Sequence, residues 1–160
     1  MKTNRFIRIM TALALCTLAL LTFGCGNTDH ANIFHATFTA GGAAKDYTTR
    51  STFYLLTPGG LYDATYTSPS GESNANCLYL ALPSNVTVGV YDKSVITLIY
   101  TDATGTQYRS DNGDAAVTLK VTAWPGPGGY AGGSFSGILA TSSGATIVIT
   151  DGRFEEYISN

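Results

Sequence analysis

Apolar and polar residues alternate with a period of two along most of the chain after residue 31, and this period restricts the chain to sheet-forming folds. Between residues 115 and 124, Val117, Leu119 and Val121 alternate with hydroxyl-bearing and charged side chains. Successive side chains of a strand point to opposite faces, so such a segment has one apolar and one polar face. Short clusters of Gly, Pro, Asn, Asp and Ser separate the alternating segments, as turns require.

The alternating segments are short, and none of them has the pattern of an amphipathic helix. We expect strands within residues 32–40, 47–49, 51–56, 61–67, 77–82, 86–91, 95–101, 107–110, 115–124, 133–140, 145–150 and 154–158. Turn signals recur about every 8–12 residues, which is typical of sandwiches and barrels. The sequence therefore predicts an all-β fold, an antiparallel β-sandwich or barrel-like sheet pair of about nine to ten short strands.

The N-terminus has the pattern of a secretory signal peptide. Three basic residues, Lys2, Arg5 and Arg8, precede an apolar run over residues 9–23. This run of about 15 residues is shorter than the ~20 that a membrane-spanning helix needs. We therefore expect a cleaved leader rather than a transmembrane anchor.

The end of the leader resembles the lipobox of bacterial lipoproteins. The residues are Leu-Thr-Phe-Gly-Cys at 21–25, with the leucine four residues before the cysteine, where the commonest form has it three before. The resemblance implies lipid attachment (palmitate among the acyl groups) at Cys25, and Gly26 behind it favours the outer membrane. The predicted organisation is a signal peptide over 1–24, a lipidated cysteine and short tether over 25–32, and a single all-β domain over 33–160.

Cysteine and charge content limit the other roles of the chain. Cys16 leaves with the leader and Cys25 carries lipid, so Cys77 remains as a small strand residue; the alternative is a Cys25–Cys77 disulfide in an unlipidated protein. The leader removes three of the nine Lys and Arg and none of the eleven Asp and Glu, which leaves a net charge of −5. An acidic chain with scattered charges does not suit nucleic acid. The expected partners are the membrane, through lipid on Cys25, and a protein or a glycan.

The C-terminal half resembles a group of small secreted β-sandwich lipoprotein domains that have no assigned activity. The similarity rests on short motifs: Gly89-Val90-Tyr91, Tyr100 with Tyr108 and Ser110, Asp111-Asn112-Gly113, Gly133-Ser134-Phe135-Ser136-Gly137, and residues 146–154. It covers less than half of the chain. It implies a fold and a cell-envelope location, and no catalytic residue.

Three kinds of reactive site are disfavoured by residue spacing. Phe135, and not a serine, occupies the centre of Gly133-Ser134-Phe135-Ser136-Gly137, which therefore lacks the nucleophile elbow Gly-x-Ser-x-Gly. Residues 111–114 have oxygen ligands but no glutamate at the offset that a calcium loop needs, and Asn-Gly favours a hairpin turn. Acidic residues fall mainly in turns rather than in facing pairs. We expect no enzyme activity, no metal and no cofactor; a hydrolase with an unfamiliar site is the less favoured alternative.

Aromatic residues are the candidate binding surface. Trp124 and Tyr130 belong to one Gly- and Pro-rich loop, and Tyr62 and Tyr66 share one face of a predicted strand. Aromatic rings beside hydroxyl groups can stack on sugars or apolar partners. The competing interpretation is that tyrosine is simply a favourable strand residue with its ring half-buried. The main functional hypothesis is a non-enzymatic envelope module, and a carbohydrate-binding module is the alternative.

Overall fold

The computed structural model describes residues 34–49, 54–55, 61–68 and 75–159. The chain divides into two units, Met1–Ala31 and Asn32–Asn160, and all described residues belong to the second. The predicted leader, Cys25 and the tether therefore lie outside the described residues. Within the described part no helix is long and apolar enough to cross a membrane.

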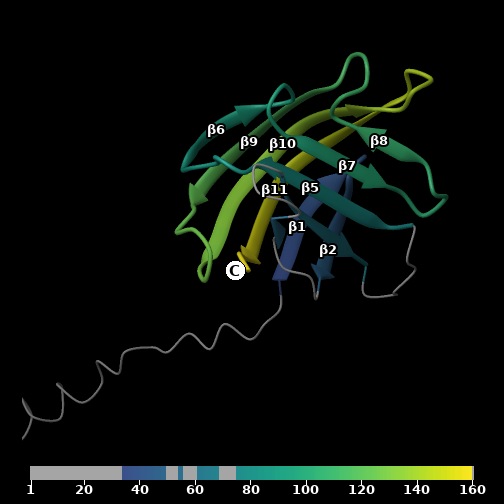
Figure 1. Cartoon of the computed structure of the whole chain (residues 1–160). Helices are drawn as coiled ribbons and strands as arrows, with labels where there is room; N and C mark the ends of the chain where they lie inside the picture. Colours follow the sequence, from purple (N-terminus) through teal and green to yellow (C-terminus); the bar gives the residue numbers. More distant parts are fainter. Residues whose placement is uncertain (1–33, 50–53, 56–60, 69–74, 160) are drawn as a thin grey trace, which may run out of the picture. The chain divides into compact units, whose positions relative to one another are not determined.

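The described residues form eleven β-strands, and every strand pairing is antiparallel (Figure 1). The strands are β1 Phe34–Ala40, β2 Ala43–Thr49, β3 Tyr54–Leu55, β4 Leu61–Thr67, β5 Cys77–Pro83, β6 Gly89–Asp92, β7 Thr97–Thr101, β8 Gln107–Arg109, β9 Ala116–Ala123, β10 Tyr130–Ala140 and β11 Thr146–Tyr157. The predicted all-β class is confirmed.

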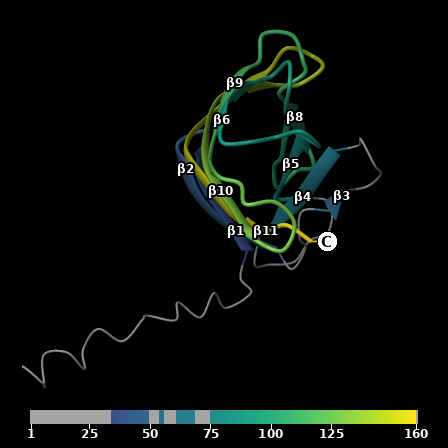
Figure 2. The same cartoon turned by 60° about the vertical axis from the view of Figure 1, so that its left-hand side comes forward.

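The pairings join all eleven strands into one sheet that curves round on itself, and its two halves, which we call the larger and the smaller sheet, face each other (Figure 2). The larger sheet has the order β6-β9-β10-β11-β1-β2, and the smaller has the order β4-β5-β7-β8 with β3 beside β4. Within the described ranges the sheets meet along two seams, each with one paired position: Thr48 with Thr67 between β2 and β4, and Arg109 with Ala140 between β8 and β10. These seams turn an eight-strand path into a closed ring, so the structure combines both predicted forms, a sheet pair and a barrel.

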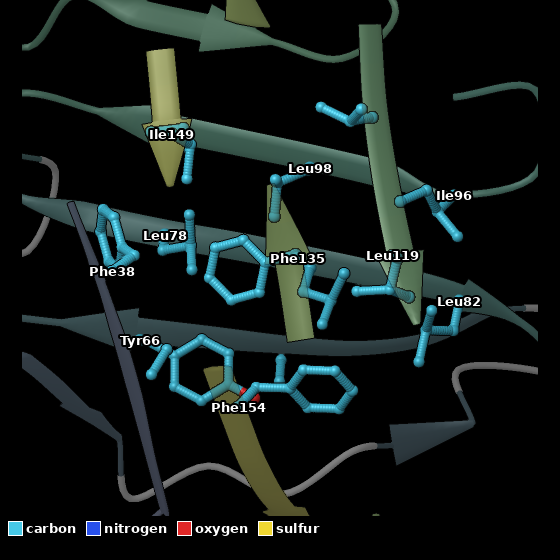
Figure 3. Close-up of a cluster of buried hydrophobic side chains, with 14 of the residues drawn as sticks. Phe38, Tyr66, Leu78, Leu82, Ile96, Leu98, Leu119, Phe135, Ile149 and Phe154 are labelled. Atoms are coloured by element: carbon cyan, nitrogen blue, oxygen red, sulfur yellow. The ribbon is translucent and has the colours of Figure 1, made fainter. Parts of the chain in front are cut away.

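The core lies between the sheets, and the period of two places its members. In β9 the buried residues are Val117, Leu119 and Val121, and in β5 they include Leu78, Leu80 and Leu82, as the alternation predicts. Figure 3 shows aliphatic and aromatic side chains from both sheets converging in this space. Phe38 packs edge-on against Tyr47 and Tyr100, with ring centroids 5.1 and 5.7 Å apart. Such edge-to-face contacts add to the stabilisation that burial supplies.

The structure corrects two local predictions. Residues 145–150 and 154–158 are one continuous strand, β11, because Asp151 adopts a positive φ of 55° and forms a bulge rather than a turn. The turn predicted at residues 111–114 is present, but it is not a hairpin: it joins β8 of the smaller sheet to β9 of the larger one. The hairpin predicted at Gly41-Gly42 is confirmed between β1 and β2, with both glycines at positive φ.

Candidate functional site

The two glycine–phenylalanine motifs of the C-terminal half pair with each other across β10 and β11. Gly133 lies opposite Phe154, Ser134 opposite Arg153, and Phe135 opposite Gly152. Each phenylalanine thus faces a glycine on the neighbouring strand. Both rings are buried and point into the core (Figure 3).

The two glycines are required by the close approach of these rings. A Cβ placed on Gly152 would lie 2.4 Å from Phe135 Cδ2, and one on Gly133 would lie 2.6 Å from Phe154 Cε1. Real side chains cannot occupy such positions without a shift of the surroundings, so glycine lets the rings cover the backbone. This packing fixes the register of the two strands and sends the intervening pair, Ser134 and Arg153, to the opposite face.

The face of the larger sheet that points away from the smaller sheet carries a row of polar residues. Ser134 pairs with Arg153 on β11 and with Lys120 on β9. Neighbouring strands lie about 4.8 Å apart, so the two cationic side chains start roughly 10 Å apart on either side of the serine. Neither the side chain of Lys120 nor that of Arg153 makes a hydrogen bond or an ion pair with any described residue. Two cationic side chains that form no ion pair with a described residue therefore flank one hydroxyl group.

Two adjoining hollows follow this row over the outer surface of β10. The first, of about 440 Å³, is lined by His35, Thr37, Thr122, Ala123, Tyr130, Ala131, Gly132, Gly133, Arg153, Phe154 and Glu155. The second, of about 450 Å³, is lined by Val90, Thr118, Lys120, Ser134, Phe135, Ser136, Asp151, Gly152 and Arg153. Arg153 belongs to both. We call this combined surface the outer groove.

Small residues on β10 create the outer groove. The outward positions of this strand are Gly132, Ser134 and Ser136, while β9 and β11 beside it carry longer side chains such as Lys120 and Arg153. A strand of small residues between strands of large residues leaves a trough along its length, because side chains stand roughly perpendicular to the sheet. The predicted placement of Ser134 and Ser136 on one face and Phe135 on the core face is confirmed.

The groove contains acidic groups as well as cations. Asp151 lies in the second hollow at the bulge of β11, and its carboxylate accepts a hydrogen bond of 3.0 Å from Thr150 Oγ1. Asp is one of the few residues that adopt positive φ at low cost, so the bulge suits it. Glu155 lies in the first hollow, opposite His35 of β1. Charge of both signs thus alternates along the groove.

The four aromatic residues predicted to form a binding surface lie in three different environments. Tyr130 lines the first hollow, and its ring contacts Tyr157 edge-on with centroids 5.3 Å apart. Trp124 is half-buried and packs edge-on against Tyr62 at 5.2 Å, at the end of the core. Tyr62 and Tyr66 do share one face, but it is the buried one, with 6 % and 0 % of their surface exposed. The interpretation of Tyr62 and Tyr66 as a ligand surface is corrected: both are core residues.

The hydroxyl group of Tyr66 and the carboxyl group of Glu156 lie near each other in the core. Neither Tyr66 Oη nor Glu156 Oε2 has a hydrogen-bond partner among the described residues, although each group is close enough to shift the pKa of the other. Burial raises the pKa of Glu156 to about 8, so the carboxyl group is largely protonated at neutral pH. Burial and the nearby Glu156 raise the pKa of Tyr66 well above its ordinary value.

Cys77 lies on the outer side of the smaller sheet, in a shallow hollow of about 670 Å³ with Tyr79 and Ile99. It forms no disulfide with a described residue. The alternative bridge to Cys25 lies outside the described residues. No group of three His, Cys, Asp or Glu side chains that could hold a metal ion occurs within the described ranges.

Asp111 and Asn112, in the turn at residues 111–114, form side-chain bonds that hold the structure together. Arg109 forms a two-pronged ion pair with Asp111 at 2.8 Å, which lowers the pKa of that carboxyl group. Asn112 Nδ2 donates to the Ala140 carbonyl at 2.9 Å. The segment therefore fastens the seam between β8 and β10.

In comparisons with known proteins, no family model, no curated protein and no solved structure matches this chain. Sequence reasoning missed Lys120 and Arg153 as site residues. The signal was present, because the period of two places Lys120, Ser134 and Arg153 on polar strand faces. What the sequence did not reveal is the pairing of β10 with both β9 and β11, which brings the three together.

Proposed function

We propose that this protein is an exported, lipid-anchored β-sandwich of the bacterial cell envelope, held in the outer membrane through Cys25, and that it acts by binding rather than by catalysis. The observation that carries the binding role is the outer groove. It is an open trough with a mixed polar and apolar lining, and the side chains of its two central cationic residues form no hydrogen bond or ion pair with a described residue. The anchor is supported by the basic leader and by the lipobox-like residues 21–25.

The anchor is tested in a Gram-negative host fed with radiolabelled palmitate. The full chain should incorporate label and partition with outer-membrane vesicles, and Cys25→Ala should lose both properties. Cys77→Ala is the matched control, since it removes a cysteine without touching the leader, and it should remain labelled. Recovery of unlabelled wild-type protein with a free thiol at residue 25 would refute the anchor.

A carbohydrate ligand is the second candidate, and the first hollow favours it over a flat protein interface. There Tyr130 presents an aromatic ring beside the hydroxyl groups of Thr37 and Thr122. Aromatic rings with adjacent hydrogen-bonding groups are suited to sugars, which have apolar faces and polar edges. A glycan array probed with the full-length protein and with Tyr130→Ala tests this: glycans that bind the wild type should be lost from the variant.

A further inference from the structure

We infer that the outer groove recognises an acidic saccharide, with the carboxylate, sulfate or phosphate group of the sugar seated over Ser134 between Lys120 and Arg153. This inference rests on the proposed binding function and names the ligand class of the same groove.

The cross-strand row supplies the donors for such a group. Lys120 and Arg153 lie on the strands at either side of Ser134, and neither side chain forms an ion pair with a described residue. The guanidinium group of Arg153 offers parallel N–H donors that match the two oxygens of a carboxylate or sulfate, and the ammonium group of Lys120 adds a point charge. The Ser134 hydroxyl group donates from the floor. An anion placed there meets three donors from three adjacent strands.

The neighbouring carboxylates argue against a polyanion. Asp151 lies beside the row in the second hollow and Glu155 lies beside it in the first. A polyphosphate or nucleic acid would place like charge against Asp151, which is unfavourable. The hydroxyl groups of a sugar instead donate to carboxylates. The alternation of charge along the groove therefore fits a ligand with isolated acidic groups separated by hydroxyl groups.

The rest of the groove fits the body of a sugar. Thr118 and Ser136 extend the second hollow with hydroxyl groups, and Tyr130 lies in the first hollow on the other side of Arg153. The two hollows together offer more room than one anion fills, so adjacent sugar units can occupy both sides of the Arg153 side chain. A simple inorganic anion would use the central row alone.

The test uses pairs of oligosaccharides that share a backbone and differ only in the acidic group. Suitable pairs are oligogalacturonate with its methyl ester, sulfated with unsulfated N-acetyllactosamine, and phosphorylated with unphosphorylated mannose oligomers. Binding to the full-length protein in non-ionic detergent is measured by calorimetry at low salt. At least one acidic member should bind about tenfold or more tightly than its neutral twin, and added salt should weaken it. If no acidic member binds better than its twin, the inference is wrong.

Charge-removing variants locate the binding. Lys120→Gln and Arg153→Gln should each weaken the preferred acidic ligand about tenfold, as expected for loss of a charge-assisted hydrogen bond. Lys93→Gln and Arg109→Gln remove the same charges outside the groove and should leave affinity unchanged. Equal loss in all four variants would indicate non-specific attraction and overturn the site. Lys120→Gln and Arg153→Gln should unfold at the wild-type temperature, since both side chains are exposed and make no hydrogen bond or ion pair within the described part. Lys93→Gln and Arg109→Gln lose hydrogen bonds, so their affinities are measured at a temperature where both variants are folded.

Inorganic phosphate serves as the free-anion arm. It should displace the acidic saccharide only at concentrations far above that of the saccharide itself. Displacement at equal concentration would contradict the inference that the groove recognises a saccharide rather than a free anion. Binding of a neutral glycan that is insensitive to Lys120→Gln would overturn this inference while leaving the proposed binding function standing. If the wild-type protein did not incorporate palmitate, only the proposed lipid anchor would be refuted.

Discussion

At the scale of single residues, the reciprocal glycine–phenylalanine pairs connect the core to the groove. Phe154 covers Gly133 and Phe135 covers Gly152 on the inner face, and the same register sets Ser134 beside Arg153 on the outer face. A residue with no side chain thus determines both how the core packs and where a cation is presented. Substitution at these glycines is expected to disturb both.

Gly133→Ala is predicted to destabilise the protein by about 1–3 kcal/mol, the range for inserting a methyl group into a filled core. Its Cβ would lie 2.3 Å from the Lys120 carbonyl oxygen and 2.6 Å from the Phe154 ring. Gly132→Ala is the matched control, because its Cβ would meet only the Phe154 carbonyl oxygen, at 3.6 Å. Chemical denaturation of both variants checks this; equal stability of the two would contradict the packing argument.

Glu156 is predicted to make stability fall as pH rises. Its pKa is raised from 4.5 to about 8 by burial, so between these values the folded protein keeps a proton that the unfolded chain releases. The free energy of unfolding should therefore decline through this window, by at most ~1.4 kcal/mol per pH unit, and level off above pH 8. The contribution is fully present below pH 4.5, where both states are protonated.

Denaturant titrations between pH 5 and pH 8 measure this slope. Glu156→Gln mimics the protonated acid and should flatten it, so that the variant gains stability relative to the wild type as pH rises. Glu155→Gln alters the adjacent exposed carboxylate and should keep the wild-type slope. An unchanged slope in Glu156→Gln would mean that another group titrates.

At the scale of elements, the sequence predicted most strands but not how they are distributed between sheets. β4 begins at Leu61 and ends at Thr67, where the alternation predicted. Asp151-Gly152 carries a turn signal, yet β11 continues through it, since pairing with β10 and β1 on both sides favours a bulge over a chain reversal. Local composition reports the propensity for a turn, whereas long-range pairing decides whether the turn forms.

The candidate site shows the same limit. Tyr130 was identified from its loop and lines the groove, but Tyr62 and Tyr66 were misassigned because periodicity shows that residues share a face without showing which face is buried. Lys120 and Arg153 are 33 positions apart in the sequence and meet only through β10. No local pattern carries that information.

The loop between β9 and β10 is predicted to contribute stability through Trp124 and binding through Tyr130. Trp124 packs against Tyr62 and the core, and Gly128 N donates to the Ile158 carbonyl at 2.8 Å, which holds the loop on the end of β11. Trp124→Ala should lower the free energy of unfolding by about 2 kcal/mol, below the range for a fully buried tryptophan. It should leave ligand affinity unchanged at a temperature where the variant is folded. Tyr130→Ala should lose ligand affinity at a temperature where the variant is folded, and a Trp124→Ala variant that loses affinity without losing stability would contradict this assignment.

At the scale of the whole domain, the two seams decide whether the molecule behaves as a closed barrel or as a sandwich. Among the described residues, each seam has one paired position and one side-chain hydrogen bond to a backbone carbonyl: Thr67 Oγ1 to Thr48 at 3.3 Å, and Asn112 Nδ2 to Ala140 at 2.9 Å. Within the larger sheet, by contrast, β10 and β11 pair almost along their whole lengths. Closure is therefore much weaker than pairing inside the sheets.

Native-state hydrogen exchange should consequently show the seams opening before the sheets separate. Amides of Arg109 and Ala140 should exchange faster than those in the centres of β10 and β11, because local opening breaks few bonds there. Asn112→Ala should accelerate exchange at that seam and reduce overall stability by only about 1 kcal/mol, the typical net value of one hydrogen bond. Asn85→Ala, at an exposed position between β5 and β6, is the control and should change neither. Uniform acceleration across β1, β10 and β11 in Asn112→Ala would mean that the ring unfolds as one cooperative barrel, since a sandwich with separable seams would confine the effect to β8 and the end of β10.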